Sequence, residues 1–506
     1  MLLADLVSCS ATVAATRART QKVAALAPVL AAAAAEGPEI LAIATSYLGG
    51  SLRQRRTGLG WRSLVDLPAP GADTSLTVAE VDAAFAAMAD LAGPGSAGAR
   101  AAAVADLFGR ATEAEQAWLR GLATGEVRQG ALDALVQEAL ARAADVPLTA
   151  VRRAAMLAGS TVAVAPLAFE GQAALDAVGL TVGRPVLPML AGSASSVAEA
   201  VATAGREHAE VAVDTKLDGI RIQVHRDGDD VRIATRSLDD ITTRLPEVVA
   251  LVRSLPATRL VLDGEALALD DDGRPRAFQD TASRTAQADG VAVTPFFFDL
   301  LHLDGRDLLD SPGHERLAAL DTLVPEQHRV PRLVTADPEA AEEFARAAVA
   351  AGHEGVVVKN LAAPYEAGRR GSGWIKVKPV HTLDLVVLGV EWGSGRRRGL
   401  LSNIHLGARD AATGGFVMVG KTFKGMTDAM LAWQTERFLE LETHREGHVV
   451  FVRPEQVVEI ALDGVQRSTR YPGGVALRFA RVVRYREDKS ADEADTVDAV
   501  RALGAS

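Results

Sequence analysis

Residues 211–226 read VAVDTKLDGIRIQVHR, and the rest of the chain can be organised around this stretch. Two short apolar runs within it alternate with polar residues, which is the period of half-buried β-strands. Asp218 and Gly219 lie between the runs and form a turn signal, so the stretch predicts a hairpin. Asp214 and Lys216 are two residues apart and share one face of the first strand. A lysine held at a strand end can act as a covalent nucleophile if its surroundings remove its proton.

Length and composition restrict the class of protein. A chain of 506 residues is too long for one hydrophobic core, which predicts several domains. The formal net charge of −11 disfavours indiscriminate binding to nucleic acid, although local basic surfaces still decide phosphate contacts. The single cysteine, Cys9, excludes intrachain disulfides and a four-cysteine zinc module and suits a reducing cytosol. We find no signal peptide and no apolar run of membrane-spanning length, so the sequence predicts a soluble cytoplasmic protein.

The chain divides into segments that differ in composition and in their predicted secondary structure. Residues 1–172 are rich in Ala and Leu, carry capping-box patterns beginning at Thr77 and Thr112, and are predicted to be helical. Residues 180–378 mix strand and helix patterns. The remaining segments are 379–490, whose order of strands, a helix and more strands suits a small Greek-key barrel of the OB kind, and 491–506, expected to form a short helix or a tail.

Apolar runs place the elements of the third segment. A helix is expected from Thr427 to about Thr443. Strands are expected at 385–390, 404–408, 416–419, 449–452, 457–462 and 475–486.

A glycine-rich loop interrupts the N-terminal helices. Residues 52–62 read LRQRRTGLGWR and contain no acidic residue. Arg53, Arg55, Arg56 and Arg62 could belong to an ordinary solvated loop, which is the simpler interpretation. The functional interpretation is a loop whose backbone and arginines meet a phosphate backbone.

Further charged motifs follow the lysine stretch in a fixed order. Phe298 is predicted on a strand, where its flat ring could stack on a nucleotide base. Any one of the motifs could be a structural strand with solvated ends. They are Thr235-Arg236-Ser237, Asp263-Gly264-Glu265, Phe298-Asp299, Glu354-Gly355 leading to Lys359, and Lys376-Val377-Lys378.

Together with the stretch from Lys216 to Arg221, these motifs resemble the series found in covalent nucleotidyltransferases, which comprise ATP-dependent DNA ligases, RNA ligases and mRNA capping enzymes. The chain is most similar to the three-domain ATP-dependent DNA ligases of mycobacteria and their relatives, because residues 419–428 and 477–489 also match that family. The resemblance covers essentially the whole chain. It departs from the family at Asp214, where many ligases have Glu, and at Ala480, where proline is common.

The resemblance implies an all-α DNA-binding domain (1–172), an α+β adenylation domain (180–378), an OB-fold barrel (379–490) and a tail (491–506). Lys216 would attack ATP and form a Lys–AMP phosphoramidate, and nearby cations are expected to lower its pKa. The implied ATP-binding residues are Asp214, Arg221, Arg236, Glu265, Phe298, Arg370, Lys376 and Lys378. Glu265 and Glu354 are the implied Mg²⁺ ligands, Arg478, Arg481 and Lys489 would reach the pyrophosphate when the barrel closes, and Arg53, Arg55, Arg56 and Arg62 would contact DNA.

The expected activity is the sealing of 5′-phosphate/3′-hydroxyl nicks in duplex DNA by a cytoplasmic, nucleoid-associated monomer that uses ATP and Mg²⁺. An RNA ligase or another lysine–AMP nucleotidyltransferase is the alternative enzyme, although capping enzymes lack a long helical module before the lysine. An NAD-dependent ligase is disfavoured, since one cysteine cannot build that family's zinc site. From a different class, a catalytically silent DNA-end-binding protein is disfavoured because no motif position is broken.

Overall fold

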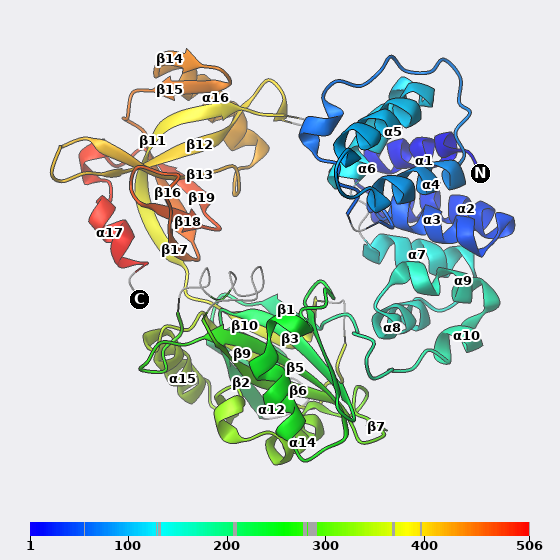
Figure 1. Ribbon diagram of the computed structural model, residues 1–506. Helices are drawn as coiled ribbons and strands as arrows, with labels where there is room; N and C mark the ends of the chain where they lie inside the picture. Colours follow the sequence, from blue (N-terminus) through cyan, green and yellow to red (C-terminus); the bar gives the residue numbers. More distant parts are fainter. Residues whose placement is uncertain are drawn as a thin grey trace.

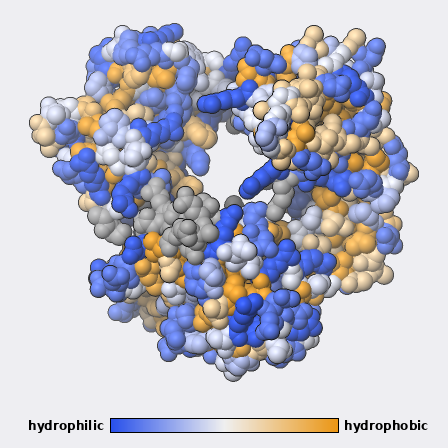
Figure 2. Space-filling view, in the orientation of Figure 1, coloured by the Kyte–Doolittle hydropathy of each residue, from blue (hydrophilic) through white to orange (hydrophobic). Residues whose placement is uncertain are grey.

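The computed structural model describes the chain apart from residues 55, 128, 130–132, 206–209, 277–280, 282–290, 367–369, 395–396 and 505–506. The described residues form a helical lobe, a mixed α/β lobe and a β-rich lobe, in chain order (Figure 1). An opening lies between the lobes, with hydrophilic side chains reaching into it (Figure 2). Within these residues no helix is long and apolar enough to cross a membrane.

The N-terminal lobe is helical, as predicted. Thr77 and Thr112 cap α4 and α6, each accepting a hydrogen bond from the backbone N–H of the glutamate three residues later, so both capping boxes are confirmed. The described elements are α1 (Leu3–Ala15), α2 (Arg19–Glu36), α3 (Pro38–Leu48), η1 (Trp61–Leu64), α4 (Val78–Asp90), α5 (Ser96–Arg110), α6 (Glu113–Thr124), α7 (Asp133–Ala143), α8 (Leu148–Ala158), α9 (Thr161–Glu170) and α10 (Gln172–Asp176).

The middle lobe contains two sheets with strand orders β1-β10-β9-β2-β8 and β4-β3-β5-β6-β7. Helices α11 and α15 pack on the first sheet, and α12 and α14 pack on the second. The strands are β1 (Leu190–Ser193), β2 (Val211–Lys216), β3 (Ile220–Asp227), β4 (Asp230–Thr235), β5 (Arg259–Ala268), β6 (Val293–Leu303), β7 (Arg306–Asp307), β8 (Arg332–Thr335), β9 (Gly355–Asn360) and β10 (Arg370–Val377). The helices are α11 (Val197–Ala204), η2 (Thr242–Arg244), α12 (Pro246–Ser254), α14 (Gly313–Leu323), η3 (Glu326–His328) and α15 (Pro338–Ala350).

The predicted hairpin around Lys216 is wrong, because β2 and β3 belong to different sheets. Val211 and Val213 pack towards α11 and α15, whereas Ala212 packs on the second sheet, so both faces of β2 are buried. The turn therefore carries the chain from one sheet to the other. A Cβ at Gly219 would lie 2.4 Å from the carbonyl oxygen of Ala266, so this crossing requires glycine.

The C-terminal lobe is rich in β-strands. The predicted helix begins as expected, with Thr427 as its cap, but it ends at Glu440 and a strand follows. The elements are β11 (His381–Trp392), β12 (Leu401–Arg409), β13 (Phe416–Thr422), α16 (Asp428–Glu440), β14 (Glu442–Glu446), β15 (Val449–Val452), β16 (Val457–Leu462), β17 (Gly464–Arg467), β18 (Val475–Arg478), β19 (Arg481–Arg486), η5 (Ala491–Glu493) and α17 (Val497–Ala502).

The single strand predicted over 475–486 is divided at Phe479, whose φ of +53° breaks the extended backbone. As a result β18 pairs with β17, whereas β19 pairs with β16. The short C-terminal helix is confirmed, and Val497 and Val500 of α17 are buried in the core of this lobe.

Candidate active site

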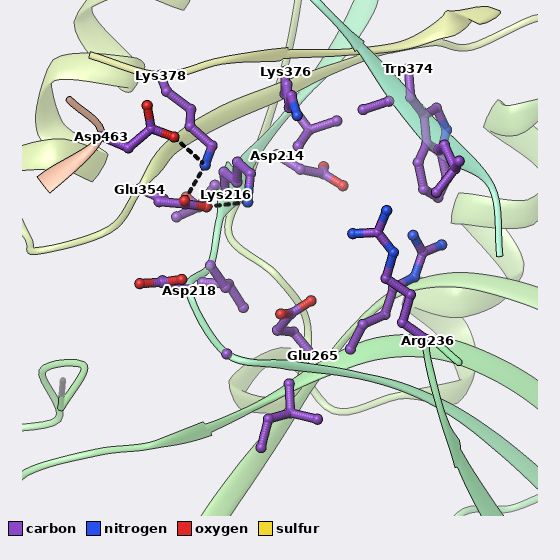
Figure 3. Close-up of a pocket in the computed structure, with 18 of the residues that line it drawn as sticks. Asp214, Lys216, Asp218, Arg236, Glu265, Glu354, Trp374, Lys376, Lys378 and Asp463 are labelled. Atoms are coloured by element: carbon purple, nitrogen blue, oxygen red, sulfur yellow. Dashed lines mark hydrogen bonds and ion pairs between the residues drawn. The ribbon is translucent and has the colours of Figure 1, made fainter. Parts of the chain in front are cut away.

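A pocket of about 1090 Å³ lies between the two sheets of the middle lobe and receives residues from the C-terminal lobe (Figure 3). The sequence-predicted residues that line it are Asp214, Lys216, Arg221, Arg236, Glu265, Phe298, Glu354, Lys376, Lys378, Arg478 and Arg481. Lys489 is not among them, and the side chain of Arg370 lies outside the described residues. The fold thus brings most of the motif series together, although it spans more than half of the chain.

Lys216 ends β2, and its ammonium forms an ion pair with one carboxylate oxygen of Glu354. Antiparallel pairing of β2 with β9 creates this contact, because Lys216 lies opposite Gly355. The other oxygen of Glu354 pairs with Lys378. Burial would raise the pKa of Glu354, but the two lysines hold it below its ordinary value. The surroundings of Lys216 are therefore mixed in charge, rather than cationic as the sequence suggested.

Arg221 of β3 is bound to a buried carboxylate. Its guanidinium donates to both oxygens of Asp263, at 3.0 and 2.6 Å, and the hydroxyl of Tyr365 donates to the same carboxylate at 2.7 Å. Nearby, burial raises the pKa of Glu265 to about 7, against the opposing effects of Lys216 and Arg221. A cation bound beside Glu265 would favour its charged form.

An aromatic corner lies at one end of the pocket. The rings of Phe298 and Trp374 are nearly perpendicular, with centroids 5.7 Å apart. The Lys359 ammonium is 4.8 Å from the centroid of the Phe298 ring and 4.5 Å from that of Trp374. Sequence reasoning assigned no role to Trp374, although it lies two residues before Lys376 on β10 and therefore shares that strand face.

Asp214 is almost fully buried and is held by two cations. Arg332 donates to it at 2.5 Å, and the Lys359 ammonium lies 2.6 Å from its second oxygen. Arg332 is the direct neighbour of Asp214 across the β2–β8 pair. No local sequence signal identified Arg332, because this contact depends on strand pairing over more than a hundred residues.

The C-terminal lobe contributes charged groups to the same pocket. Arg478 donates to Asp218 at 2.7 and 3.3 Å. Asp463 lies 3.6 Å from the Lys378 ammonium and 3.4 Å from Arg481. In contrast, Lys489 lies away from the pocket and pairs with Asp384 at 2.6 Å, a contact within its own lobe.

The basic loop of the helical lobe is only partly available to a ligand. Arg53 forms ion pairs with Glu39 at 2.5 Å and Asp82 at 3.2 Å, so acids from α3 and α4 occupy it. Arg56 and Arg62 are exposed, whereas Arg55 falls outside the described residues. Sequence reasoning overlooked Trp61, which is 60% exposed and has the Arg120 guanidinium 5.7 Å from its ring.

Comparisons with known proteins point to one family. Family models match in chain order: DNA ligase N terminus over residues 67–141, ATP dependent DNA ligase domain over 188–378, and ATP dependent DNA ligase C terminal region over 397–489. The chain is 71% identical to a probable DNA ligase of Nocardioides sp., with 99% of each chain covered. It is 70% identical to a probable DNA ligase of Kineococcus radiotolerans, covering 99% of this chain and 100% of that one.

A solved structure named Pmar-Lig_Pre has the same overall fold. It is 17% identical, covers 95% of this chain and 99% of its own, and superposes with a TM-score of 0.64. At that identity the likeness concerns the fold alone. Nearly full-length relatives with identities of 70% or more decide the family. The chain belongs to the ATP-dependent DNA ligases.

Proposed function

We propose that this enzyme seals 5′-phosphate/3′-hydroxyl nicks in duplex DNA through a covalent AMP on Lys216. The observation that supports this most directly is the placement of Lys216 in a pocket large enough for a nucleotide. The ammonium of Lys216 forms an ion pair with Glu354, and cationic side chains from two lobes line the same pocket. A helical lobe ahead of this site favours a DNA ligase over a capping enzyme. Its exposed Arg56 and Arg62 suit contacts to duplex phosphates.

The first step is transfer of AMP to the enzyme. Lys216 loses a proton, and its amine attacks the α-phosphorus of ATP; a P–N bond forms while the bond to the bridging oxygen of pyrophosphate breaks. Glu354 contacts the lysine nitrogen and holds it in the pocket, and the proton passes to water. Lys378, Arg478 and Arg481 would stabilise the charge that develops on the departing pyrophosphate.

The aromatic corner would bind the base. Phe298 offers a ring face for stacking, and Trp374 closes the corner at a right angle to it. Asp214 would lie behind the base with its carboxylate already held by Arg332 and Lys359. Arg221, Arg236, Arg370, Lys376 and Lys378 are proposed to contact the rest of the nucleotide.

Glu265 and Glu354 are proposed to hold Mg²⁺. Among the described residues no three His, Cys, Asp or Glu side chains gather into a metal cluster. The two carboxylates of Glu265 and Glu354 therefore fit an ion whose other ligands are phosphate and water oxygens, as is usual for Mg²⁺. When bound, the ion would neutralise phosphate charge during the transfer.

The remaining steps act on DNA. AMP passes from Lys216 to the 5′-phosphate of the nick, and the 3′-hydroxyl then attacks that phosphate, forming the phosphodiester and releasing AMP. We propose that the C-terminal lobe is an OB barrel, that 1–172, 180–378, 379–490 and 491–506 are the domain limits, and that the enzyme acts as a nucleoid-associated monomer.

The test is incubation with α-labelled ATP or GTP, followed by a chase with nicked duplex. A covalent AMP adduct, no GMP adduct, and conversion of a DNA nick to sealed strand are expected. Adduct formation with sealing only of nicks in RNA would favour the RNA ligase instead. Absence of any adduct, with retained binding to DNA ends, would favour the silent DNA-binding protein.

A further inference from the structure

Asp463 is an acidic residue in a pocket that should receive polyanions. It lies between β16 and β17, at the point where the C-terminal lobe meets the middle lobe, and its backbone N–H donates to the carbonyl of Arg478 at 3.1 Å. Its side chain is 22% exposed, and it is one of the groups that line the pocket around Lys216. A carboxylate in this place would repel phosphates unless cations hold it.

Two cations do face this carboxylate, one from each lobe. Lys378 of the middle lobe lies 3.6 Å from one of its oxygens, and Arg481 of the C-terminal lobe lies 3.4 Å from the other. Lys378 is itself bound to Glu354, which is bound to Lys216. Groups of alternating charge therefore run from the C-terminal lobe to the proposed nucleophile, in the order Asp463, Lys378, Glu354, Lys216 (Figure 3).

This row is continuous only while the C-terminal lobe covers the pocket. Lys378, Glu354 and Lys216 all belong to the middle lobe, so they remain together whatever the C-terminal lobe does. Asp463 is the only member contributed by the other lobe. If that lobe moved away, Lys378 would keep Glu354 but would lose the carboxylate that restrains its ammonium from the opposite side.

We infer that Asp463 is a positioning residue for enzyme adenylation: on closure of the C-terminal lobe it fixes the ammonium of Lys378 between two carboxylates, where it meets the phosphates of ATP beside Lys216. This inference rests on the proposed Lys216–AMP chemistry. Asp463 touches neither the nucleophile nor, in this role, the nucleotide. A long lysine side chain has many rotamers, and a second carboxylate selects the one that points into the pocket.

A positioning role for Asp463 predicts a loss confined to adenylation, whereas a merely structural role predicts losses in both steps. Replacing Asp463 by Asn keeps the shape but removes the charge, so Lys378 loses its second anchor only in the closed state. Single-turnover adenylation by Asp463→Asn should be roughly tenfold slower at saturating ATP, with little change in the ATP concentration that gives half the maximal rate. Sealing of a chemically pre-adenylated nick, which bypasses this step, should proceed at close to the wild-type rate.

Two further variants sharpen the experiment. Asp463→Glu keeps the carboxylate and should recover much of the adenylation rate. Glu459→Gln removes a carboxylate from the neighbouring strand β16 that pairs with Arg484 at 2.8 Å and does not line the pocket, so its adenylation should match wild type. All rates are measured on the full chain, with thermal melting to verify that each variant is folded.

The outcomes separate this inference from the function on which it rests. Wild-type protein that forms no AMP adduct would overturn the Lys216 chemistry itself. Wild-type protein that forms the adduct, with Asp463→Asn equally fast, would overturn only the role of Asp463. Equal losses in adenylation and in sealing of the pre-adenylated nick, or no recovery in Asp463→Glu, would make Asp463 a structural residue of the interface.

Discussion

Arg478 and Asp218 are 260 positions apart in the chain, yet the arginine donates two hydrogen bonds to the aspartate, at 2.7 and 3.3 Å. Asp218 belongs to the turn that follows Lys216, and Arg478 ends β18 of the C-terminal lobe. The contact therefore joins the C-terminal lobe to the segment that carries the proposed nucleophile. An incoming triphosphate would compete with Asp218 for Arg478, because both are anions that a guanidinium binds through paired oxygens.

Arg478→Ala should slow adenylation from ATP while leaving the sealing of a pre-adenylated nick close to wild type. Cations around the leaving pyrophosphate lower the barrier only when they are present in the transition state, and the later steps release no pyrophosphate. Arg484→Ala is the matched control, since Arg484 lies on β19, pairs with Glu459 and does not line the pocket. Equal loss of both steps in Arg478→Ala, at unchanged DNA affinity, would contradict a role for Arg478 that is confined to adenylation.

Lys489→Ala tests a residue whose placement differs from the expectation. The sequence resemblance put Lys489 at the pyrophosphate, but its ammonium pairs with Asp384 near the start of β11. If that contact is its main role, adenylation by Lys489→Ala should fall less than adenylation by Arg478→Ala, and the melting temperature should fall instead. Adenylation rates of the two variants, compared with their melting curves, decide between the placements. A larger adenylation loss in Lys489→Ala would mean that the lobe reaches a different arrangement with ATP.

Lys216→Ala should abolish the covalent adduct and leave DNA binding near normal. Lys216→Arg should fail as well, because a guanidinium stays protonated at working pH and cannot attack phosphorus. Peptide mass spectrometry of the wild-type adduct should find AMP on Lys216. The assignment would be lost if AMP were found on another lysine.

The arginines of the basic loop should separate into two kinds. Arg56→Ala and Arg62→Ala should weaken DNA binding and flatten its dependence on salt, because both side chains are exposed and suited to phosphates. Arg53→Ala should instead destabilise the helical lobe by roughly 1–2 kcal/mol, since it leaves the largely buried carboxylate of Asp82 without this partner. Salt titrations of DNA affinity and urea unfolding curves measure the two effects. A flattened salt dependence in Arg53→Ala with unchanged stability would reverse the assignment.

Stability should fall as the pH is lowered from about 7, in part through His225. Burial lowers the pKa of His225 to about 3, and Arg232 and His302 add to the shift. Because the folded pKa lies below the ordinary value of 6.5, the unfolded chain binds the proton first, and this part of the stability is lost as pH falls from about 6.5 towards 3. His225→Gln should be less stable than wild type at pH 7 but should lose less between pH 7 and 5, measured by urea unfolding. If the free energy of unfolding fell by the same amount between pH 7 and 5 in both proteins, His225 would not contribute to the pH dependence.

Local sequence determined the elements whose causes are themselves local. The capping glutamates at Glu80 and Glu115 lie three residues from their threonines, so the starts of α4 and α6 could be predicted from spacing alone. The strands β15 and β16 were predicted with their observed bounds for a similar reason, because compact apolar runs set them. Motif order likewise identified Lys216 and the residues that now line one pocket with it.

Only the tertiary structure decided how these elements meet. The alternation of apolar and polar residues predicts that β2 and β3 are strands. It does not show that they join different sheets, because strand pairing depends on what buries each face. Arg332 reaches Asp214 through strand register, and Asp463 reaches Lys378 through the packing of one lobe on another. Such contacts arise from burial and charge pairing between segments far apart in the chain, which no local spacing encodes.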